Sequence, residues 1–321
     1  MARFDICVIG LGAMGSAAAF QAADRGASVL GIDRYTPPHA SGSTHGESRI
    51  TRQAIGEGDA YVPLVLRSNE IWRDIEAKTG SDLLTQCGGL IMGPRDCPRG
   101  QHGVTDFVQS TINTAENYCI DHEVLSAPDA MLRFPQFRLA GDEAVYYEPG
   151  AGFLRPERCV EAQLHLAQDA GAVLRTGETV HGFTESATSV LVTTDTAIHE
   201  ADQVILAAGP WMSQLVDPEL SALFEVYRQV LYWFPVLDDS QMFDPTNCPV
   251  FIWETPSDDG QWGLYGFPAF NGPSGGVKVA TRNTKVVQRL TSLILKSVKT
   301  RSSRCSDGTS NPTWSALVPT A

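Results

Sequence analysis

The first 33 residues alternate between short apolar runs and an alanine-rich segment. The apolar run Phe4–Ile9 predicts a buried strand, and Ala17–Arg25 has the composition of a helix. A second apolar run, Ser28–Ile32, predicts another strand, which ends at Asp33. This order of strand, helix and strand is that of a βαβ unit, so we expect an α/β protein with a parallel sheet.

A glycine-rich turn joins the first strand to the helix. Gly10 permits the tight turn, Gly12 lets the backbone approach a pyrophosphate at the helix N-terminus, and Gly15 allows close packing of helix and strand. Asp33 can accept hydrogen bonds from a ribose hydroxyl, so the segment predicts a dinucleotide site. The glycine pattern does not separate FAD from NAD, and Arg34 beside Asp33 leaves NADP open.

A turn-rich loop follows Asp33 and leads to a predicted helix at Ser48–Gln53. In such a helix Arg49 and Arg52 lie on one face, with His45 just before it. Two guanidinium groups so close together repel each other unless an anion lies between them. The loop is therefore either part of a ligand site near the carboxyl ends of the strands or a solvated basic turn.

Later segments extend the same architecture. Cys159–Ala170 has the apolar spacing of a helix, and Val190–Thr194 and Gln203–Ala207 predict strands. Ala207-Ala208-Gly209 ends the last of these with a backbone that can approach a cofactor closely, although a plain strand-end turn is the alternative.

Composition and charge exclude several classes of protein. The chain has 321 residues, which suggests two domains, and its 43% apolar and 19% charged residues exclude disorder, collagen and coiled coil. A net charge of −13 argues against a nucleic-acid partner. Seven scattered cysteines without a C-x-x-C pair predict neither a disulfide framework nor a metal site, and fit a cytoplasmic location. No apolar run is long enough to predict a transmembrane helix.

The last 40 residues differ from the rest in charge and motifs. From Arg282 onward there are seven Lys or Arg against one acid, a net charge of +6, whereas residues 1–281 carry −19. We interpret 282–321 as a frame-shifted or mis-spliced end. A basic amphipathic helix and a solvated, disordered extension are the alternatives.

Eleven ordered motifs between residues 3 and 281 resemble the monomeric sarcosine oxidase and N-methyltryptophan oxidase family of FAD-dependent amine oxidases, within the D-amino acid oxidase-like superfamily. They are Gly10–Gly15, Asp33-Arg34, Pro37–His39, Gly42–Arg52, Gly56–Leu64, Tyr147–Pro149, Gly152–Cys159, Asp202–Trp211, Tyr227–Val230, Tyr265–Pro268 and Gly275–Ala280.

The resemblance implies two discontinuous domains. Residues 1–85 and 150–215 would form a Rossmann-like FAD-binding domain. Residues 86–149 and 216–281 would form an α+β substrate domain with a mostly antiparallel sheet. Residues 282–321 match no family motif, so the C-terminal part of the flavin domain is expected to be missing.

The resemblance also assigns roles in catalysis. Arg49 matches an arginine against the flavin ring, and His45 a residue near that ring. Arg52 matches the arginine that holds the substrate carboxylate. Lys278 matches the lysine that promotes the reaction with oxygen, and Tyr265 a tyrosine lining the amine pocket.

Eight further residues are expected to bind FAD, namely Gly10, Gly12, Gly15, Asp33, Arg34, Ser43, Ser48 and Gly209. The family attaches FAD covalently through a cysteine in a Cys-x-Tyr-Thr context, which is not recognisable here. Cys305 stands in a different context, so we do not expect it to be the anchor.

The family reaction oxidises a secondary N-methyl amino acid with O2 to an imine, which yields an aldehyde, and to hydrogen peroxide. The resemblance thus predicts a monomeric amine oxidase with a small-molecule substrate. Sarcosine, N-methyltryptophan, pipecolate and fructosyl amino acids are all candidates. An inactive truncated member of the family and a NAD(P)-dependent dehydrogenase are the alternatives.

Overall fold

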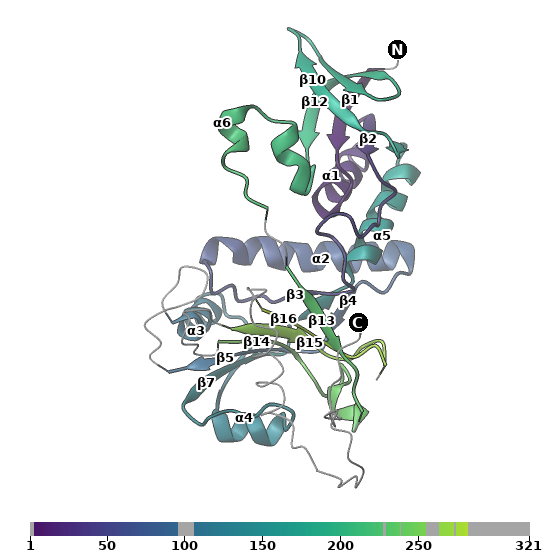
Figure 1. The fold of residues 1–321 in the computed structure, drawn as a ribbon. Coiled ribbons are helices and arrows are strands. Elements are labelled where there is room, and N and C mark those ends of the chain that lie inside the picture. The colour runs from purple at the N-terminus through teal and green to yellow at the C-terminus, as the bar shows by residue number, and fades with distance from the viewer. Residues whose placement is uncertain are drawn as a thin grey trace, which may run out of the picture. The chain divides into compact units, whose positions relative to one another are not determined.

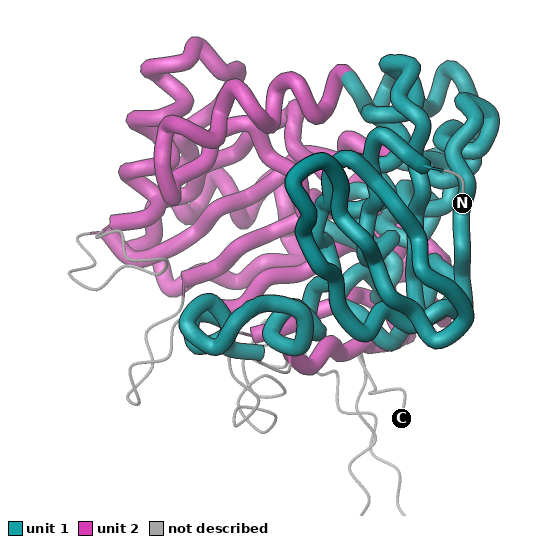
Figure 2. The backbone as a smooth tube through the Cα atoms, turned by 90° about the horizontal axis from the view of Figure 1, so that it is seen from above, with its two compact units in different colours: residues 1–49, 71–83, 154–227 teal, residues 50–70, 84–153, 228–321 magenta. Residues whose placement is uncertain are grey.

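The chain forms two compact units, shown in two colours in Figure 2. The first unit contains residues 1–49, 71–83 and 154–227, and the second contains 50–70, 84–153 and 228–321. The computed structural model describes residues 3–95, 106–226, 229–237, 239–254, 263–272 and 274–281. The predicted basic tail, 282–321, lies outside the described residues.

A six-stranded sheet organises the first unit (Figure 1). Its order is β10-β11-β12-β1-β2-β9, in which β9, β2, β1 and β12 are parallel and β10, β11 and β12 are antiparallel. The strands are β1 (Arg3–Ile9), β2 (Val29–Asp33), β9 (Val173–Thr176), β10 (Val180–Glu185), β11 (Val190–Thr194) and β12 (Ile198–Leu206). Helices α1 (Ala13–Ala23) and α5 (Pro156–Asp169) share an apolar core with the sheet that includes Val8, Phe20 and Val160.

The predicted βαβ unit is confirmed, with small shifts at its boundaries. The helix begins at Ala13 rather than Ala17, because Gly12 already occupies the N-cap position. The strand predicted at Val190–Thr194 has those bounds, and the strand predicted at Gln203–Ala207 is the second half of β12. The parallel sheet of an α/β fold follows from this unit.

The glycines of the turn between β1 and α1 are required by close backbone contacts. Gly10 has a φ of +92°, and a Cβ on it would lie 2.5 Å from the carbonyl oxygen of Ala207. A Cβ on Gly15 would lie 1.7 Å from the carbonyl oxygen of Gly10. The turn is also held by Asp33, whose Oδ2 accepts a hydrogen bond of 2.8 Å from the N–H of Leu11.

A seven-stranded sheet organises the second unit. Its order is β13-β16-β15-β14-β5-β7-β6, and every pair is antiparallel except β14 with β5, as predicted for a mostly antiparallel sheet. The strands are β5 (Gly89–Pro94), β6 (Glu123–Ser126), β7 (Glu143–Glu148), β13 (Leu231–Phe234), β14 (Val250–Trp253), β15 (Leu264–Phe267) and β16 (Val277–Thr281). Helices α3 (Phe107–Asn117) and α4 (Ala127–Arg133) pack into separate cores on its opposite faces (Figure 1).

The remaining elements lie outside these two large sheets. A three-stranded sheet has the order β3-β8-β4. Its strands and the other elements are β3 (Arg49–Thr51), β4 (Leu84–Gln86), β8 (Gly152–Leu154), α2 (Val62–Thr79), α6 (Pro218–Ser221), η1 (Asp59–Tyr61), η3 (Gly209–Gln214) and η4 (Ser240–Phe243). Within the described part of the chain, no helix has the length and apolar composition to cross a membrane.

The helix predicted at Ser48–Gln53 is wrong, because Arg49–Thr51 forms strand β3. β-Branched Ile50 and Thr51 favour an extended backbone, and β3 pairs with β8. The compact units also divide the chain differently from the expected domains, since residues 50–70 cluster with the second unit. Hydrogen bonds from the N–H groups of Gln53 and Ala54 to Glu148 tie this segment to β7.

We expect Gly15→Ala to lower the free energy of unfolding by at least about 2 kcal/mol, because the added methyl group would overlap the carbonyl oxygen of Gly10. Gly182→Ala is the matched control, since a Cβ there would meet no atom within 4 Å. Chemical denaturation of both variants measures the difference. Equal stability of the two variants would contradict this account of the turn.

Candidate functional site

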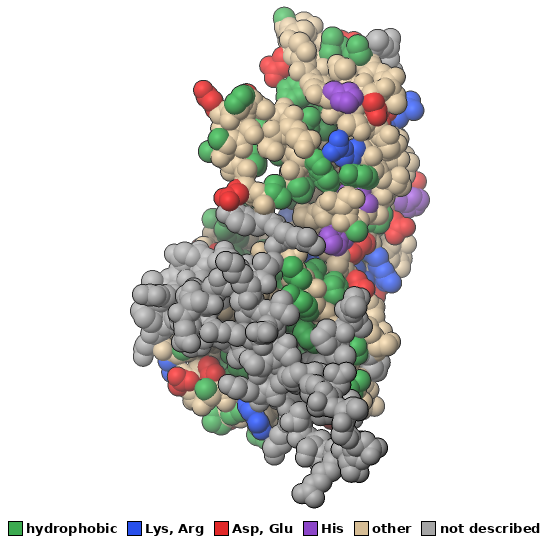
Figure 3. Space-filling model, viewed as in Figure 1, with side chains coloured by type: hydrophobic (Ala, Val, Ile, Leu, Met, Phe, Trp, Pro, Cys, Tyr) green, Lys and Arg blue, Asp and Glu red, His purple; other side chains and the backbone are tan. Residues whose placement is uncertain are grey.

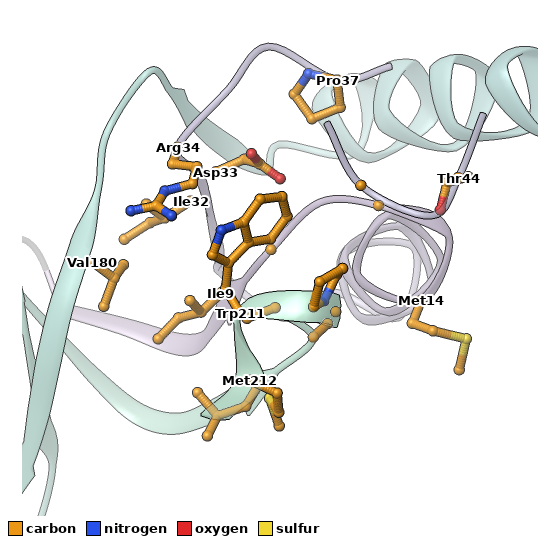
Figure 4. A pocket seen from close by; sticks show the side chains of 18 of the residues that line it. Ile9, Met14, Ile32, Asp33, Arg34, Pro37, Thr44, Val180, Trp211 and Met212 are labelled. Atoms are coloured by element: carbon orange, nitrogen blue, oxygen red, sulfur yellow. The ribbon is translucent and has the colours of Figure 1, made fainter. Parts of the chain in front are cut away.

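The first unit contains a cavity of about 570 Å³ at the carboxyl ends of β1, β2 and β12 (Figure 4). Ile9 and Gly10 come from the end of β1, Asp33 and Arg34 from the end of β2, and Gly209 follows β12. This is the position at which open α/β sheets bind ligands. The residues predicted to bind a dinucleotide that line the cavity are Gly10, Gly12, Asp33, Arg34, Ser43 and Gly209.

The N-terminus of α1 opens into this cavity. Gly12 is its N-cap and forms no side-chain capping bond, and the first turn contains no acidic residue. A Cβ on Gly12 would approach only Thr44 Oγ1, at 3.4 Å, whereas Gly10 and Gly15 are enclosed by backbone. The positive end of the helix dipole thus faces the cavity, as a pyrophosphate requires, and the N–H of Ala13 donates to Thr44 Oγ1 at 3.2 Å.

Asp33 and Arg34 form one wall of the cavity together with Trp211. Asp33 Oδ1 accepts a hydrogen bond of 2.8 Å from the N–H of Tyr35, and the Asp33 side chain is buried. The guanidinium of Arg34 lies 5.6 Å from the centre of the Trp211 ring, and Figure 4 shows both side chains beside Asp33. Sequence reasoning missed Trp211, although it lies only two residues after Gly209.

Apolar side chains border the cavity. Met14 and Phe224 line it and remain 77% and 46% exposed. Hydrophobic side chains gather around η3 and α6 on the face of the first unit shown in Figure 3, and Leu220 and Leu223 are among the exposed ones. The cavity therefore offers a ligand both apolar surface and the polar groups of the β-strand ends.

The loop after β2 holds Arg49 through backbone carbonyl groups. The guanidinium donates hydrogen bonds of 2.5 Å to the carbonyl of Ser43 and 2.8 Å to that of Ser48. The Glu157 carboxylate accepts bonds from two N–H groups of the same loop, including one of 2.6 Å from Gly46. The Ser48 side chain is buried, and neither Ser48, His45 nor Gly15 lines the cavity.

Lys278 and Tyr265 lie on one face of the sheet in the second unit. Lys278 is 1% exposed and stands in register between Phe267 on β15 and Trp233 on β13. Its Nζ lies 4.3 Å from the centre of the Phe267 ring and 5.9 Å from that of Trp233. Tyr265 is two residues before Phe267, so its side chain points to the same face.

Arg52 lies near the same face, beside Tyr146 and Glu148 of β7. Arg52, Tyr146 and Glu148 line a small space of about 10 Å³. The guanidinium forms an ion pair with Glu57 and lies 5.5 Å from the ring centre of Phe107. Its Nε atom is buried and has no hydrogen-bond partner among the described residues. Arg52 thus keeps one buried N–H donor that the described residues leave unused.

The predicted site residues therefore fall into two groups. Gly10, Gly12, Gly15, Asp33, Arg34, His45, Ser43, Ser48, Arg49 and Gly209 belong to the first unit, and Arg52, Tyr265 and Lys278 belong to the second. Within the described residues, no group of three His, Cys, Asp or Glu side chains is arranged to bind a metal ion.

The family model for FAD dependent oxidoreductases matches residues 5–320. The chain belongs to this family. Membership of this family implies FAD as the cofactor, and the cavity of the first unit offers the helix N-terminus and Asp33 that a dinucleotide requires. The nicotinamide alternative receives no support from this match. The match also includes the basic tail and does not favour an inactive truncated protein.

Curated relatives are similar along most of this chain. Monomeric sarcosine oxidase of Streptomyces avermitilis is 40% identical over 277 residues, which cover 86% of this chain and 69% of the relative. Monomeric sarcosine oxidase of Bacillus sp. strain B-0618 is 35% identical, over 84% of this chain and 66% of its own length. N-methyl-L-tryptophan oxidase of Citrobacter koseri is 32% identical, over 84% and 68%. The matched part thus spans about two thirds of each relative.

Solved structures share the fold. NikD, an unusual amino acid oxidase essential for nikkomycin biosynthesis, superposes with a TM-score of 0.70 at 27% identity. The alignment covers 88% of this chain and 70% of that chain. Glycine oxidase from Geobacillus kaustophilus has a TM-score of 0.66 at 19% identity, over 88% of this chain and 72% of that chain, and supports the fold alone.

We expect Gly12→Ala to weaken FAD binding about tenfold or more while it preserves stability. The methyl group would occupy the space over the N-terminus of α1 but would meet no backbone atom within 4 Å. Fluorescence titration of the flavin-free chain measures the affinity, and thermal unfolding of the flavin-free chain provides the control. An unchanged dissociation constant would show that the pyrophosphate binds elsewhere.

Proposed function

We propose that this chain oxidises the C–N bond of a secondary N-methyl amino acid with O2, as do oxidases of the sarcosine or N-methyltryptophan type. The substrate carbon loses a hydride equivalent and the nitrogen a proton, which gives an imine. Water hydrolyses the imine to an aldehyde and a primary amine. O2 takes up the two electrons with two protons and leaves as hydrogen peroxide. Bound FAD supplies the acceptor for the hydride equivalent and returns the electrons to oxygen.

The observation that carries this proposal is the placement of two cations near one face of the second unit's sheet. Arg52 retains an unused, buried Nε donor, and Lys278 is buried between two aromatic rings. A guanidinium is suited to bind a carboxylate through two parallel hydrogen bonds. A buried ammonium group favours negative charge that develops nearby, as on oxygen when it accepts electrons.

The other predicted residues have supporting parts in this proposal. Tyr265 presents its ring on the face that carries Lys278 and would line the amine pocket. Arg49 is fixed by the carbonyls of Ser43 and Ser48 and would hold its charge against the flavin ring, with His45 in the same loop. Rigid placement matters because a preorganised charge stabilises the transition state without reorganisation.

We further propose a monomeric, cytoplasmic enzyme that holds FAD without a covalent bond. All five cysteines of the described residues are free, which suits a reducing compartment.

The described cysteines also bear on how FAD is held. None of them lines the cavity of the first unit, and burial raises the pKa of Cys7 and Cys159 to about 12, which keeps these thiols unreactive. Cys97 and Cys305 lie outside the described residues. Acid precipitation distinguishes the two modes, because covalent flavin stays in the pellet.

A substrate screen tests the proposed reaction. Sarcosine, N-methyltryptophan, pipecolate and a fructosyl amino acid are each given to the FAD-loaded chain in air, and hydrogen peroxide is measured. We expect peroxide from at least one of them and none from its carboxamide, because Arg52 needs a carboxylate. A flavin-loaded, folded chain that makes no peroxide from any of the four would refute the reaction.

We expect Lys278→Met to slow the reaction of the reduced enzyme with O2 by about 10²- to 10³-fold, because it removes a preorganised positive charge. Anaerobic oxidation of the amine should change little. Stopped-flow mixing of the reduced enzyme with oxygen measures the first rate constant. Lys78→Met is the matched control, since Lys78 also lies over an aromatic ring, 5.5 Å from the centre of Phe20, but is half exposed. Equal oxygen rates for both variants would exclude the role of Lys278.

A further inference from the structure

Glu148 is a buried carboxylate that the proposed reaction does not use. It ends strand β7, is 1% exposed, and accepts three hydrogen bonds. Its Oε1 accepts from the N–H of Gln53 at 2.7 Å, and its Oε2 accepts from the N–H of Ala54 at 3.1 Å and from the hydroxyl of Tyr146 at 2.9 Å. The three bonds leave this carboxylate well satisfied in an apolar surrounding.

Two of these bonds fix the backbone immediately after Arg52. Gln53 and Ala54 are the next residues in the chain, so their N–H groups determine where the Arg52 side chain begins. Strand β7 is itself held between β5 and β6 by its ladder hydrogen bonds. Glu148 therefore fixes the segment that carries Arg52 relative to the strands of the sheet.

The chemistry of this contact requires a carboxylate. Two neighbouring N–H groups and a hydroxyl need two acceptor oxygens, whereas a glutamine offers one acceptor and one donor. Burial raises the pKa of Glu148, and the N–H groups of Gln53 and Ala54, the Tyr146 hydroxyl and the Arg52 cation oppose this effect. The same burial raises the pKa of Tyr146, which keeps its hydroxyl as a donor. Burying an ionisable group such as the Glu148 carboxyl lowers the stability of the fold unless it is paired, so we infer that Glu148 has a function at this position.

We propose that Glu148 is a positioning residue for Arg52: it fixes the backbone beside Arg52, while Glu57 pairs with the guanidinium, so that Arg52 can bind a substrate carboxylate. This inference rests on the proposed function, in which Arg52 binds that carboxylate. Glu148 and Tyr146 line, together with Arg52, the same small space of about 10 Å³. Loss of Glu148 would leave two N–H groups without acceptors and free the Arg52 segment from β7.

Glu148→Gln in the FAD-loaded chain tests this. We expect the KM for the amino acid substrate found in the screen to rise about 10- to 100-fold, with kcat within about threefold and flavin content unchanged. Tyr146→Phe removes only one of the three bonds and should raise KM about fivefold. Glu143→Gln is the matched control, because Glu143 is also buried on β7 and accepts two loop N–H bonds, from Ala140 and Gly141. Its KM should stay at the wild-type value.

A binding measurement separates this inference from the proposed reaction. Calorimetric titration with acetate should show binding to the wild type, weaker binding to Glu148→Gln, and none to Arg52→Met. This pattern supports the positioning role even if the screen finds no turnover. Wild-type affinity in Glu148→Gln, absence of acetate binding in the wild type, or an equal loss in Glu143→Gln would each overturn it.

Discussion

The architecture of the first unit depends on one steric constraint, the close approach of backbone atoms at the turn between β1 and α1. The carbonyl of Gly10 lies where a side chain on Gly15 would begin, and the carbonyl of Ala207 excludes one on Gly10. Only glycine allows β1, α1 and the end of β12 to meet this closely. Because they meet, the open end of α1 and the carboxylate of Asp33 face one cavity, and a dinucleotide can contact both.

In the second unit, the register of the strands, rather than a local sequence motif, brings the candidate site residues together. Tyr146, Ile91, Ile252 and Tyr265 follow one another across four strands, because each is paired with the next. Side chains alternate between the two faces of a strand, so one face collects the groups that surround Arg52 and Lys278. The opposite face is an apolar core closed by α4. The candidate site residues thus share their face of the sheet with a second apolar core, which includes Ile91, Tyr146 and Phe107 of α3.

Local patterns predicted the first unit better than the second. The βαβ unit and its glycines lie within the first 33 residues, and three of the predicted FAD residues in them, Gly10, Gly12 and Asp33, line one cavity. The helix at Ser48–Gln53 was wrong because pairing with β8, about 100 residues later, decides the conformation of β3. Glu148 and Trp211 were not predicted as site residues, since their roles depend on which segments lie beside them. The roles of Lys278 and Tyr265 came from family resemblance, because an isolated lysine or tyrosine in a strand has no distinctive pattern.

The burial of Lys278 affects which amino-acid substitutions are favourable at this position. An ammonium group between Phe267 and Trp233 loses most of its hydration when the protein folds. An apolar residue of similar length would pack at this position of β16 without that cost. Laboratory evolution that selects only for thermal stability would therefore tend to replace this lysine. If selection for activity retains it, the lysine is needed for turnover.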